Sequence, residues 1–118
     1  MNTDHLFQYG LPVVVLGFML WRSLKFKHAV KTEVPRLIAA GAVVVDVRTP
    51  AEYAGGSAAG SINIPLAEFD RGVSRFSVDQ PIVLCCASGA RSGAALAILK
   101  KKGFRQVVNA GPWTNLRT

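Results

Sequence analysis

Two adjacent cysteines stand at the end of a short apolar run, and small residues and an arginine follow them. The segment reads Ile82-Val-Leu-Cys-Cys-Ala-Ser-Gly-Ala-Arg-Ser92. Its β-branched beginning predicts a buried strand that ends on Cys86. Beyond Arg91, apolar residues at helical spacing and three lysines before Gly103 predict a helix. We therefore expect Cys86 to lie between the end of a strand and the start of a helix.

A thiol at such a position becomes more reactive. Unpaired amide N–H groups and the positive end of the helix dipole favour an anion there, and the thiolate is the nucleophilic form of cysteine. Small residues allow the loop to curl until successive amides point inward as an anion-binding nest. We expect Cys86 to be the nucleophile, and the loop around it to consist of Ala87, Ser88, Gly89, Ala90, Arg91 and Ser92.

The other cysteine, Cys85, has strand residues before it and is expected to be an ordinary core residue. Two adjacent cysteines cannot form the usual disulfide framework, and no C-x-x-C pair or His/Cys cluster indicates a metal site. We predict neither a metal nor a cofactor. A vicinal Cys85–Cys86 disulfide that acts as a redox switch is an alternative, although the ring that it closes is strained.

The segments around the cysteine loop predict an α/β domain. Apolar runs typical of strands alternate with segments that carry helix caps, and this alternation favours three layers around a parallel sheet, with ligands at the carboxyl ends of its strands. In chain order we expect a helix at 33–40 capped by Thr32, a strand at 42–47, a helical turn at 49–53, a strand at 62–64, a helical stretch from Pro65 towards Phe76, and a last strand at 104–108.

Asp46 and Arg48 stand where the strand at 42–47 ends. A buried carboxylate is normally paired with a cation. We therefore expect Asp46 to pair with Arg48 and to fasten the loop at the strand end, a structural rather than a catalytic role.

Three segments resemble the rhodanese family. Cys86-Ala-Ser-Gly-Ala-Arg-Ser92 is similar to the active-site pattern C-x-x-G-x-R-S of that family. Asp46-Val-Arg-Thr-Pro-Ala-Glu-Tyr53 is similar to its D-V-R-x-x-x-E-[FY] motif, and Gly60-Ser-Ile-Asn-Ile-Pro65 to its G-A-x-N-I-P motif. The three motifs occur in the family's order, and the resemblance spans the chain from about residue 30 to its end.

The resemblance implies a three-layer rhodanese-like fold with a central parallel sheet, and a thiosulfate sulfurtransferase activity. In such a reaction Cys86 attacks the outer sulfur of thiosulfate or of a persulfide donor and carries it as a persulfide, whose terminal sulfur is stabilised by the loop amides. A thiol, cyanide or a partner protein then accepts the sulfur. In the family, the counterparts of Asp46 and Arg48 are mostly structural.

The chain departs from the family pattern at two turns. Gly55-Gly-Ser-Ala-Ala-Gly60 replaces the usual G-H-I-P-G, so this loop lacks a histidine, an isoleucine and a proline that relatives have. Asn109-Ala-Gly-Pro112 replaces N-x-G-G, and proline fixes φ and removes a donor. We expect both turns to differ in detail from those of relatives, and Trp113 to cover the core.

Two other functions are compatible with the motif. Cys85 and Arg91 have the C-x5-R spacing of cysteine phosphatases, but Gly89 fits the rhodanese pattern only when counted from Cys86, and Leu84 stands where phosphatases commonly have histidine. A non-enzymatic, membrane-bound module that carries sulfur or binds a partner is the other alternative.

The chain has 118 residues and a formal charge of +7, which fits one domain with a modest core. The basic residues cluster behind an apolar run and at the end of a predicted helix. They form no stripe interleaved with aromatic residues. We therefore predict that the protein does not bind nucleic acid.

The apolar run from Leu6 to Trp21 carries no charge and precedes a basic cluster. As a helix it spans about 24 Å, less than the roughly 30 Å of hydrocarbon in a bilayer, and Leu24 and Phe26 extend it. Tyr9 and Trp21 occupy positions typical of interfacial aromatics. We predict a single-pass membrane anchor that contacts lipid through residues 6–21.

The positive-inside rule then places the folded domain in the cytoplasm. We divide the chain into a hydrophobic helix with its basic flank at 1–27 and a rhodanese-like domain at 28–118. A short basic linker at 26–31 spans this boundary. Asp4 before the run argues against a signal peptide, and the missing polar face argues against an interfacial helix. A helix buried in a soluble dimer is the remaining alternative.

Overall fold

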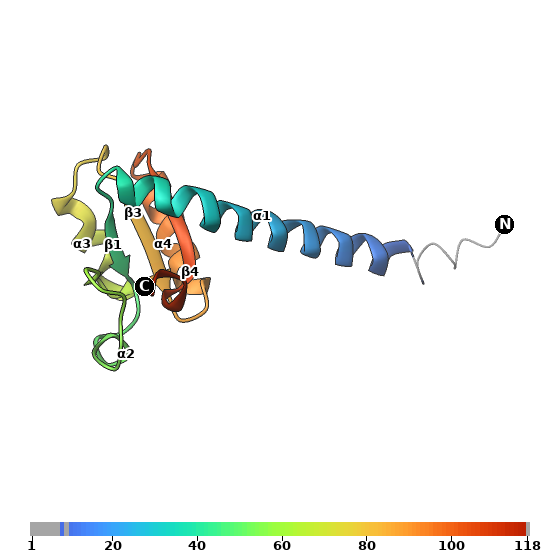
Figure 1. The fold of residues 1–118 in the computed structure, drawn as a ribbon, viewed down its shortest axis with the longest axis horizontal. Helices are drawn as coiled ribbons and strands as arrows, with labels where there is room; N and C mark the ends of the chain where they lie inside the picture. The colour runs from blue at the N-terminus through green and yellow to red at the C-terminus, as the bar shows by residue number, and fades with distance from the viewer. Residues whose placement is uncertain (1–7, 9, 118) are drawn as a thin grey trace.

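The structure is a computed structural model that describes residue 8 and residues 10–117. Four strands alternate with helices, as the pattern of apolar runs predicts (Figure 1). In chain order the elements are α1 (Leu11–Ala39), β1 (Val43–Asp46), α2 (Pro50–Ala54), β2 (Ile62–Asn63), the 3-10 turn η2 (Leu66–Glu68), α3 (Phe69–Gly72), the 3-10 turn η3 (Val73–Arg75), β3 (Ile82–Cys86), α4 (Ala90–Lys101), β4 (Val107–Pro112) and the 3-10 turn η4 (Trp113–Leu116).

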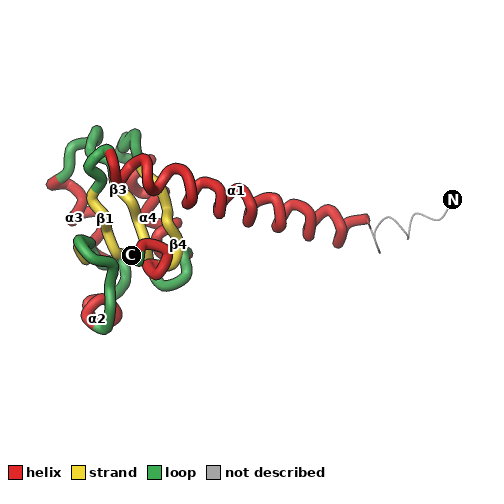
Figure 2. Tube along the Cα trace, viewed as in Figure 1, coloured by secondary structure: helices red, strands yellow, loops and turns green. Residues whose placement is uncertain are grey.

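The four strands form one parallel sheet in the order β2-β1-β3-β4. The C-terminal part of α1 lies across one face of the sheet and α4 lies on the other (Figures 1 and 2). The predicted three-layer α/β fold with a central parallel sheet and a preceding N-terminal helix is confirmed. Because all strands run the same way, their carboxyl ends meet at one edge, where the loop after β3 begins.

Each face of the sheet has its own apolar core. Strand alternation sends Ile82, Leu84 and Cys86 of β3 into the cluster under α4, which includes Phe69 and Leu99. On the other face, Val83 packs with Val34 and Leu37 of α1 and with Val108 and Ala110 of β4. The burial of these side chains on both faces explains why the strands read as continuous apolar runs.

The last strand differs from its prediction. We expected a strand at 104–108 and a turn at 109–111, but β4 begins at Val107 and continues to Pro112. Its pairing with β3 shifts register between Leu84 and Cys86, and Gly111 adopts a φ of 78°. Pro112 is tolerated because β4 is an edge strand, where a missing N–H leaves no partner unpaired.

The predicted linker at 26–31 and the helix start at Thr32 are wrong, because α1 runs without interruption from Leu11 to Ala39. Between Gly17 and Pro35 the sequence contains no glycine or proline that would interrupt a helix. The Thr32 hydroxyl donates to the His28 carbonyl one turn earlier, at 2.9 Å, as in a helix interior rather than at a cap. The predicted boundary after residue 27 falls inside this helix, and the division of the chain there stays a prediction.

The predicted membrane anchor is contradicted. Within residues 8 and 10–117, no helix contains an 18-residue stretch that is apolar enough to cross a bilayer. The physical reason lies in Arg22, Lys25 and Lys27: eighteen helical residues counted from Leu11 include all three cations. The predictions of a lipid-spanning segment and of a single-pass topology facing the cytoplasm are wrong. Leu6 and Tyr9, which belonged to the predicted segment, lie outside the described residues.

Candidate active site

The Cys86 sulfur lies inside the loop that follows β3. The Gly89 amide donates to Cys86 Sγ at 2.9 Å, and the Ser92 hydroxyl lies 3.3 Å from the same atom. Burial by itself raises the pKa of the Cys86 thiol, but hydrogen bonds from the Ser92 hydroxyl and from the Ser92, Gly89 and Ser88 amides outweigh it and lower the pKa below the ordinary thiol value. The loop therefore favours a thiolate at Cys86.

The other residues of the loop differ from Cys86 in their exposure. Ala87, Ser88 and Ala90 are exposed, whereas Cys86 is fully buried. The Ser88 hydroxyl accepts from the Ala90 amide at 3.4 Å and so lies within the turn.

Gly89 gives the loop its shape. It is the residue before α4 and has a φ of 102°, a conformation that side-chain-bearing residues rarely adopt. A Cβ atom at Gly89 would lie 3.2 Å from the Cα atom of Gly111, so the loop backbone packs directly on the end of β4. Close backbone contact and the left-handed φ both require glycine here.

Cys85 has a different environment. Strand alternation directs it to the face opposite Cys86, and it is fully buried. Burial, together with the nearby Asp46 carboxylate, raises the pKa of the Cys85 thiol to about 12, so this thiol stays protonated at neutral pH. Both cysteines are free. Opposite orientations within one strand are incompatible with the vicinal disulfide that we considered.

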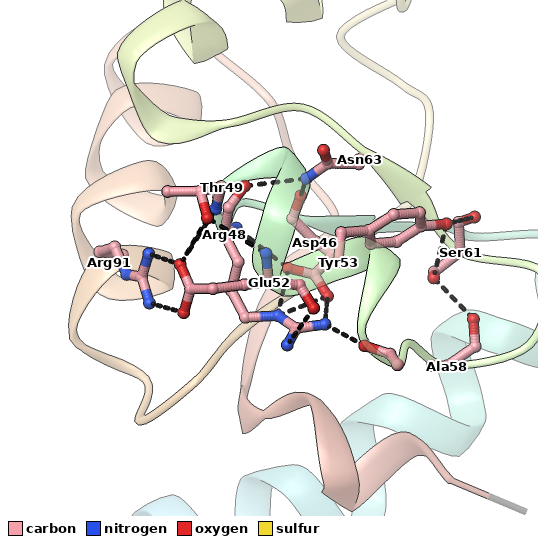
Figure 3. A network of polar contacts seen from close by, with 10 residues as sticks. Asp46, Arg48, Thr49, Glu52, Tyr53, Ala58, Ser61, Asn63 and Arg91 are labelled. Atoms are coloured by element: carbon pink, nitrogen blue, oxygen red, sulfur yellow. Dashed lines mark hydrogen bonds and ion pairs between the residues drawn. The ribbon is translucent and has the colours of Figure 1, made fainter.

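Arg91 binds Glu52 of α2 through its guanidinium group. Its guanidinium contacts both carboxylate oxygens, at 2.7 and 2.9 Å (Figure 3). Glu52 also closes the capping box with Thr49 at the start of α2, so the predicted cap at Thr49 is present. The Arg91 hydrogen bonds, and then those from Thr49, lower the pKa of Glu52 to about 2. This arrangement ties the start of α4 to α2.

Asp46 and Arg48 form the buried pair that the sequence led us to expect. The Arg48 Nε donates to both Asp46 carboxylate oxygens at 3.0 Å, and Nη2 donates to Oδ2 at 2.8 Å (Figure 3). Nη2 also donates to the Gly56 carbonyl at 2.6 Å. The guanidinium lies 4.9 Å from the centre of the Trp113 ring. The pair thus joins the end of β1 to the loop after α2 and to η4.

The loop at 55–60, which lacks the family's histidine and proline, is held by two side chains outside it. The Tyr53 hydroxyl donates to the Ser61 carbonyl at 2.6 Å, and the Ser61 hydroxyl donates to the Ala58 carbonyl at 2.6 Å (Figure 3). Ala58 is buried. Polar contacts at the two ends of the loop therefore replace the missing residues.

Two residues of the site were not identified from the sequence. Glu52 belongs to the motif around Asp46, but nothing in its spacing indicates that it pairs with Arg91, which lies 39 positions away. Asn109 lies on β4, and its side chain contacts Ser92 and Gly89 of the active-site loop. Its place in the N-x-G-G motif was the available signal, and we had assigned that motif to a turn.

The arrangement supports nucleophilic chemistry at sulfur. The helix α4 begins directly after Gly89, so its first amides and its dipole face Cys86. Within the described part of the chain, no group of three or more His, Cys, Asp and Glu side chains is placed to hold a metal ion. An ionised thiol in a ring of amide donors can attack an electrophilic atom and stabilise the anion that forms.

Comparison with known proteins gives the same picture. A family model described as a rhodanese-like domain matches residues 30–111. A sulfurtransferase of Allochromatium vinosum is 37% identical over 67 residues, 57% of this chain and 63% of the relative. The thiosulfate sulfurtransferase PspE of Escherichia coli is 36% identical over 69 residues, 57% of this chain and 66% of the relative.

A solved structure of the human single-domain sulfurtransferase TSTD1 is 25% identical, with a TM-score of 0.63 over 70% of this chain and 88% of that one. The chain spans only 40% to 63% of the length of three of its sequence relatives. The family match nevertheless covers the sheet, the cysteine loop and α4. This chain belongs to the rhodanese-like family.

Proposed function

We propose that this protein is a sulfurtransferase that carries sulfane sulfur as a persulfide on Cys86. The observation that carries the proposal is the convergence of amide and hydroxyl donors on Cys86 Sγ, with the Gly89 amide at 2.9 Å. Relatives named sulfurtransferase and thiosulfate sulfurtransferase support sulfur transfer as the chemistry. Thiosulfate or a persulfide is the donor, and a thiol, cyanide or a protein is the acceptor.

The first step is attack of the Cys86 thiolate on the outer sulfur of thiosulfate. A bond forms between Cys86 Sγ and that sulfur, the sulfur–sulfur bond of thiosulfate breaks, and its electron pair leaves with sulfite. The negative charge moves from Sγ to the terminal sulfur of the persulfide. The leaving group needs no proton, which fits a loop that offers hydrogen-bond donors and no acid. Attack by an acceptor on the terminal sulfur regenerates the thiolate.

The roles of the other loop residues follow from their contacts. The backbone of Ala87, Ser88, Gly89 and Ala90 forms the wall around the transferred sulfur. Arg91 braces the loop, because both of its terminal nitrogens bind Glu52. The Ser92 hydroxyl stabilises the thiolate. Asp46 and Arg48 support the neighbouring strand end.

The phosphatase alternative receives less support. It requires Cys85 as the nucleophile and Arg91 as the phosphate ligand. Cys85 has a pKa raised to about 12, and Arg91 is paired with a carboxylate. Each of these environments opposes the role that a phosphatase needs.

Mass spectrometry after incubation with thiosulfate tests the proposal. We expect the peptide that contains both cysteines to gain the mass of one sulfur atom in the unsubstituted chain and in Cys85→Ser, but not in Cys86→Ser. Sulfur gained by Cys86→Ser and lost from Cys85→Ser would contradict the assignment. Repeated turnover with cyanide as acceptor distinguishes an enzyme from a carrier, which releases sulfur only to a protein partner.

A further inference from the structure

The Ser92 hydroxyl lies between two acceptors. Its oxygen is 3.3 Å from Cys86 Sγ and 2.7 Å from the Asn109 side-chain oxygen Oδ1. Ser92 is fully buried. A hydroxyl carries one proton and can donate to one acceptor at a time. Cys86 and Asn109 therefore compete for this single hydrogen bond.

The orientation of the Asn109 amide is fixed from its other side. Its Nδ2 group donates to the Gly89 carbonyl at 3.1 Å, and its Oδ1 atom accepts from the Gly111 amide at 2.8 Å. A rotation of the amide by half a turn would place donors against the Gly111 N–H and leave the Gly89 carbonyl without a partner. Asn109 Oδ1 thus stays available to Ser92 in every state of the cysteine.

The reaction changes which acceptor is stronger. As a thiolate, Cys86 Sγ carries a full charge, and hydrogen bonds to charged acceptors are the stronger ones. In the persulfide that we propose above, Sγ is bonded to a second sulfur and is uncharged. The terminal sulfur must remain accessible to an acceptor, so it points toward the exposed loop residues and away from buried Ser92. The Ser92 hydroxyl then loses its charged partner, and a buried hydroxyl without an acceptor is unfavourable.

We propose that Asn109 is a positioning residue that accepts the Ser92 hydroxyl when Cys86 carries sulfur and releases it to Cys86 when the sulfur has been passed on. Asn109 acts through Ser92 and touches no reacting atom. It stabilises the loaded state relative to the thiolate. This inference rests on the proposed function and adds to it a residue on β4, outside the loop motif.

The two roles that Asn109 can have predict opposite changes in the pKa of Cys86 when Asn109 is replaced by alanine. If it competes for the hydroxyl, Asn109→Ala leaves Cys86 as the sole acceptor, and the pKa of Cys86 falls. If it only anchors the loop through Gly89, the same substitution loosens the amide ring, and the pKa of Cys86 rises. The ionisable groups Arg91 and Cys85 interact with Cys86, and neither is altered by the substitution.

The experiment measures the rate of Cys86 alkylation by iodoacetamide against pH, in the full chain. We expect the pKa from this profile to fall by about half a unit to one unit in Asn109→Ala, and to rise in Ser92→Ala. On the Ser92→Ala background, Asn109→Ala should change nothing further. Asn115→Ala is the matched control, because Asn115 Nδ2 also bonds a backbone carbonyl of this region, that of Ala110, at 2.8 Å. It should leave the profile unchanged.

A second readout follows the loaded state. At a fixed ratio of thiosulfate to sulfite, the fraction of Cys86 that carries a persulfide should fall several-fold in Asn109→Ala and stay constant in Asn115→Ala. A raised pKa of Cys86 in Asn109→Ala would overturn the proposed role of Asn109. So would a change in this pKa that is equal with and without the Ser92 hydroxyl. Absence of persulfide from the unsubstituted chain overturns the proposed function, while the sign of the pKa change is measured independently of it.

Asn109→Asp covers the case in which the alanine variant does not fold. The carboxylate keeps an acceptor for Ser92 and for the Gly111 amide, and it holds the hydroxyl more strongly. Its charge raises the pKa of Cys86 whether or not the proposal holds. The informative comparison is therefore the size of this rise with Ser92 present and in Ser92→Ala. We expect a larger rise with Ser92 present than in Ser92→Ala. Equal rises would overturn the proposal.

Discussion

Arg91 at the start of α4 and Glu52 in α2 form a two-pronged ion pair, with nitrogen to oxygen distances of 2.7 and 2.9 Å. The arginine that completes the active-site motif is therefore occupied by a carboxylate of its own chain. Glu52 serves two elements at once, because it also caps α2 through Thr49. The pair connects the helix behind the cysteine loop to the segment that follows β1.

Because of this ion pair, we expect the stability of the fold to decrease at acid pH. The pKa of Glu52 is lowered from its ordinary value of 4.5 to about 2, so its contribution is fully present above pH 4.5 and is lost as the pH falls towards 2. Thermal unfolding followed by circular dichroism should show a steeper decline of Tm in this range for the unsubstituted chain than for Glu52→Gln. Parallel curves of Tm against pH for the two proteins would show that the Arg91–Glu52 pair contributes nothing to the pH dependence of stability.

The pKa of Cys86 sets the pH dependence of its reactivity. Because the thiolate reacts, alkylation should accelerate as the pH rises through the lowered pKa of Cys86 and reach a plateau below the ordinary thiol value of 9.0. Cys85→Ser should keep this profile, since the Cys85 thiol is buried and has a pKa of about 12. An unsubstituted chain that reacts only above pH 9 would contradict the stabilisation of the Cys86 thiolate by the loop amides.

Gly89→Ala should damage both the fold and the site. The φ of 102° costs a non-glycine residue about 1–2 kcal/mol, and the new Cβ would meet the Gly111 backbone at 3.2 Å. Gly103→Ala is the control, with a φ of 91° and nothing within 4 Å of the Cβ. Urea unfolding should show a larger loss for Gly89→Ala, and only this variant should slow the alkylation of Cys86. Equal losses would mean that the close contact is unimportant.

Asp46→Asn should destabilise the domain strongly, because it leaves the buried Arg48 guanidinium without its counter-charge. Removal of one partner from a buried pair costs about 3 kcal/mol or more. Asp79→Asn provides the comparison, since Asp79 pairs with Arg105 at 3.4 Å with both side chains exposed, and it should change the free energy of unfolding by less than about 1 kcal/mol. Similar losses in urea unfolding would contradict a special role for the buried pair.

The sequence predicted most of the fold because its signals are local. The strand that ends on Cys86, the cap at Thr49 and the strand predicted at 42–47, which the structure has at Val43–Asp46, each depend on residues within a few positions of one another. The continuous helix α1 was missed because Thr32 and Pro35 resemble a helix start, and only the preceding residues show that the helix has already begun. The membrane segment was overestimated because the cations that follow the apolar run were interpreted as its flank, whereas they belong to the same helix.

The site was harder to predict where it depends on contacts between distant segments. The loop motif identified Cys86 and the residues around it, and their roles stay predictions. The partners of the loop, Glu52 and Asn109, come from α2 and β4, and each is placed by the packing of the sheet rather than by its neighbours in the chain. The hydrogen bond between Asn109 and Ser92 joins residues 17 positions apart, which a pattern of apolar residues cannot indicate.

The opposite orientation of the two neighbouring cysteines also determines how the chain responds to peroxide. An ionised thiol is the form that is oxidised to sulfenic acid, and a nearby resolving cysteine normally converts that species to a disulfide. These 118 residues contain two cysteines, and Cys85 faces the other side of β3. Within these residues, Cys85 therefore cannot resolve a sulfenic acid formed on Cys86, and that species stays open to further oxidation to sulfinic acid until another thiol reduces it.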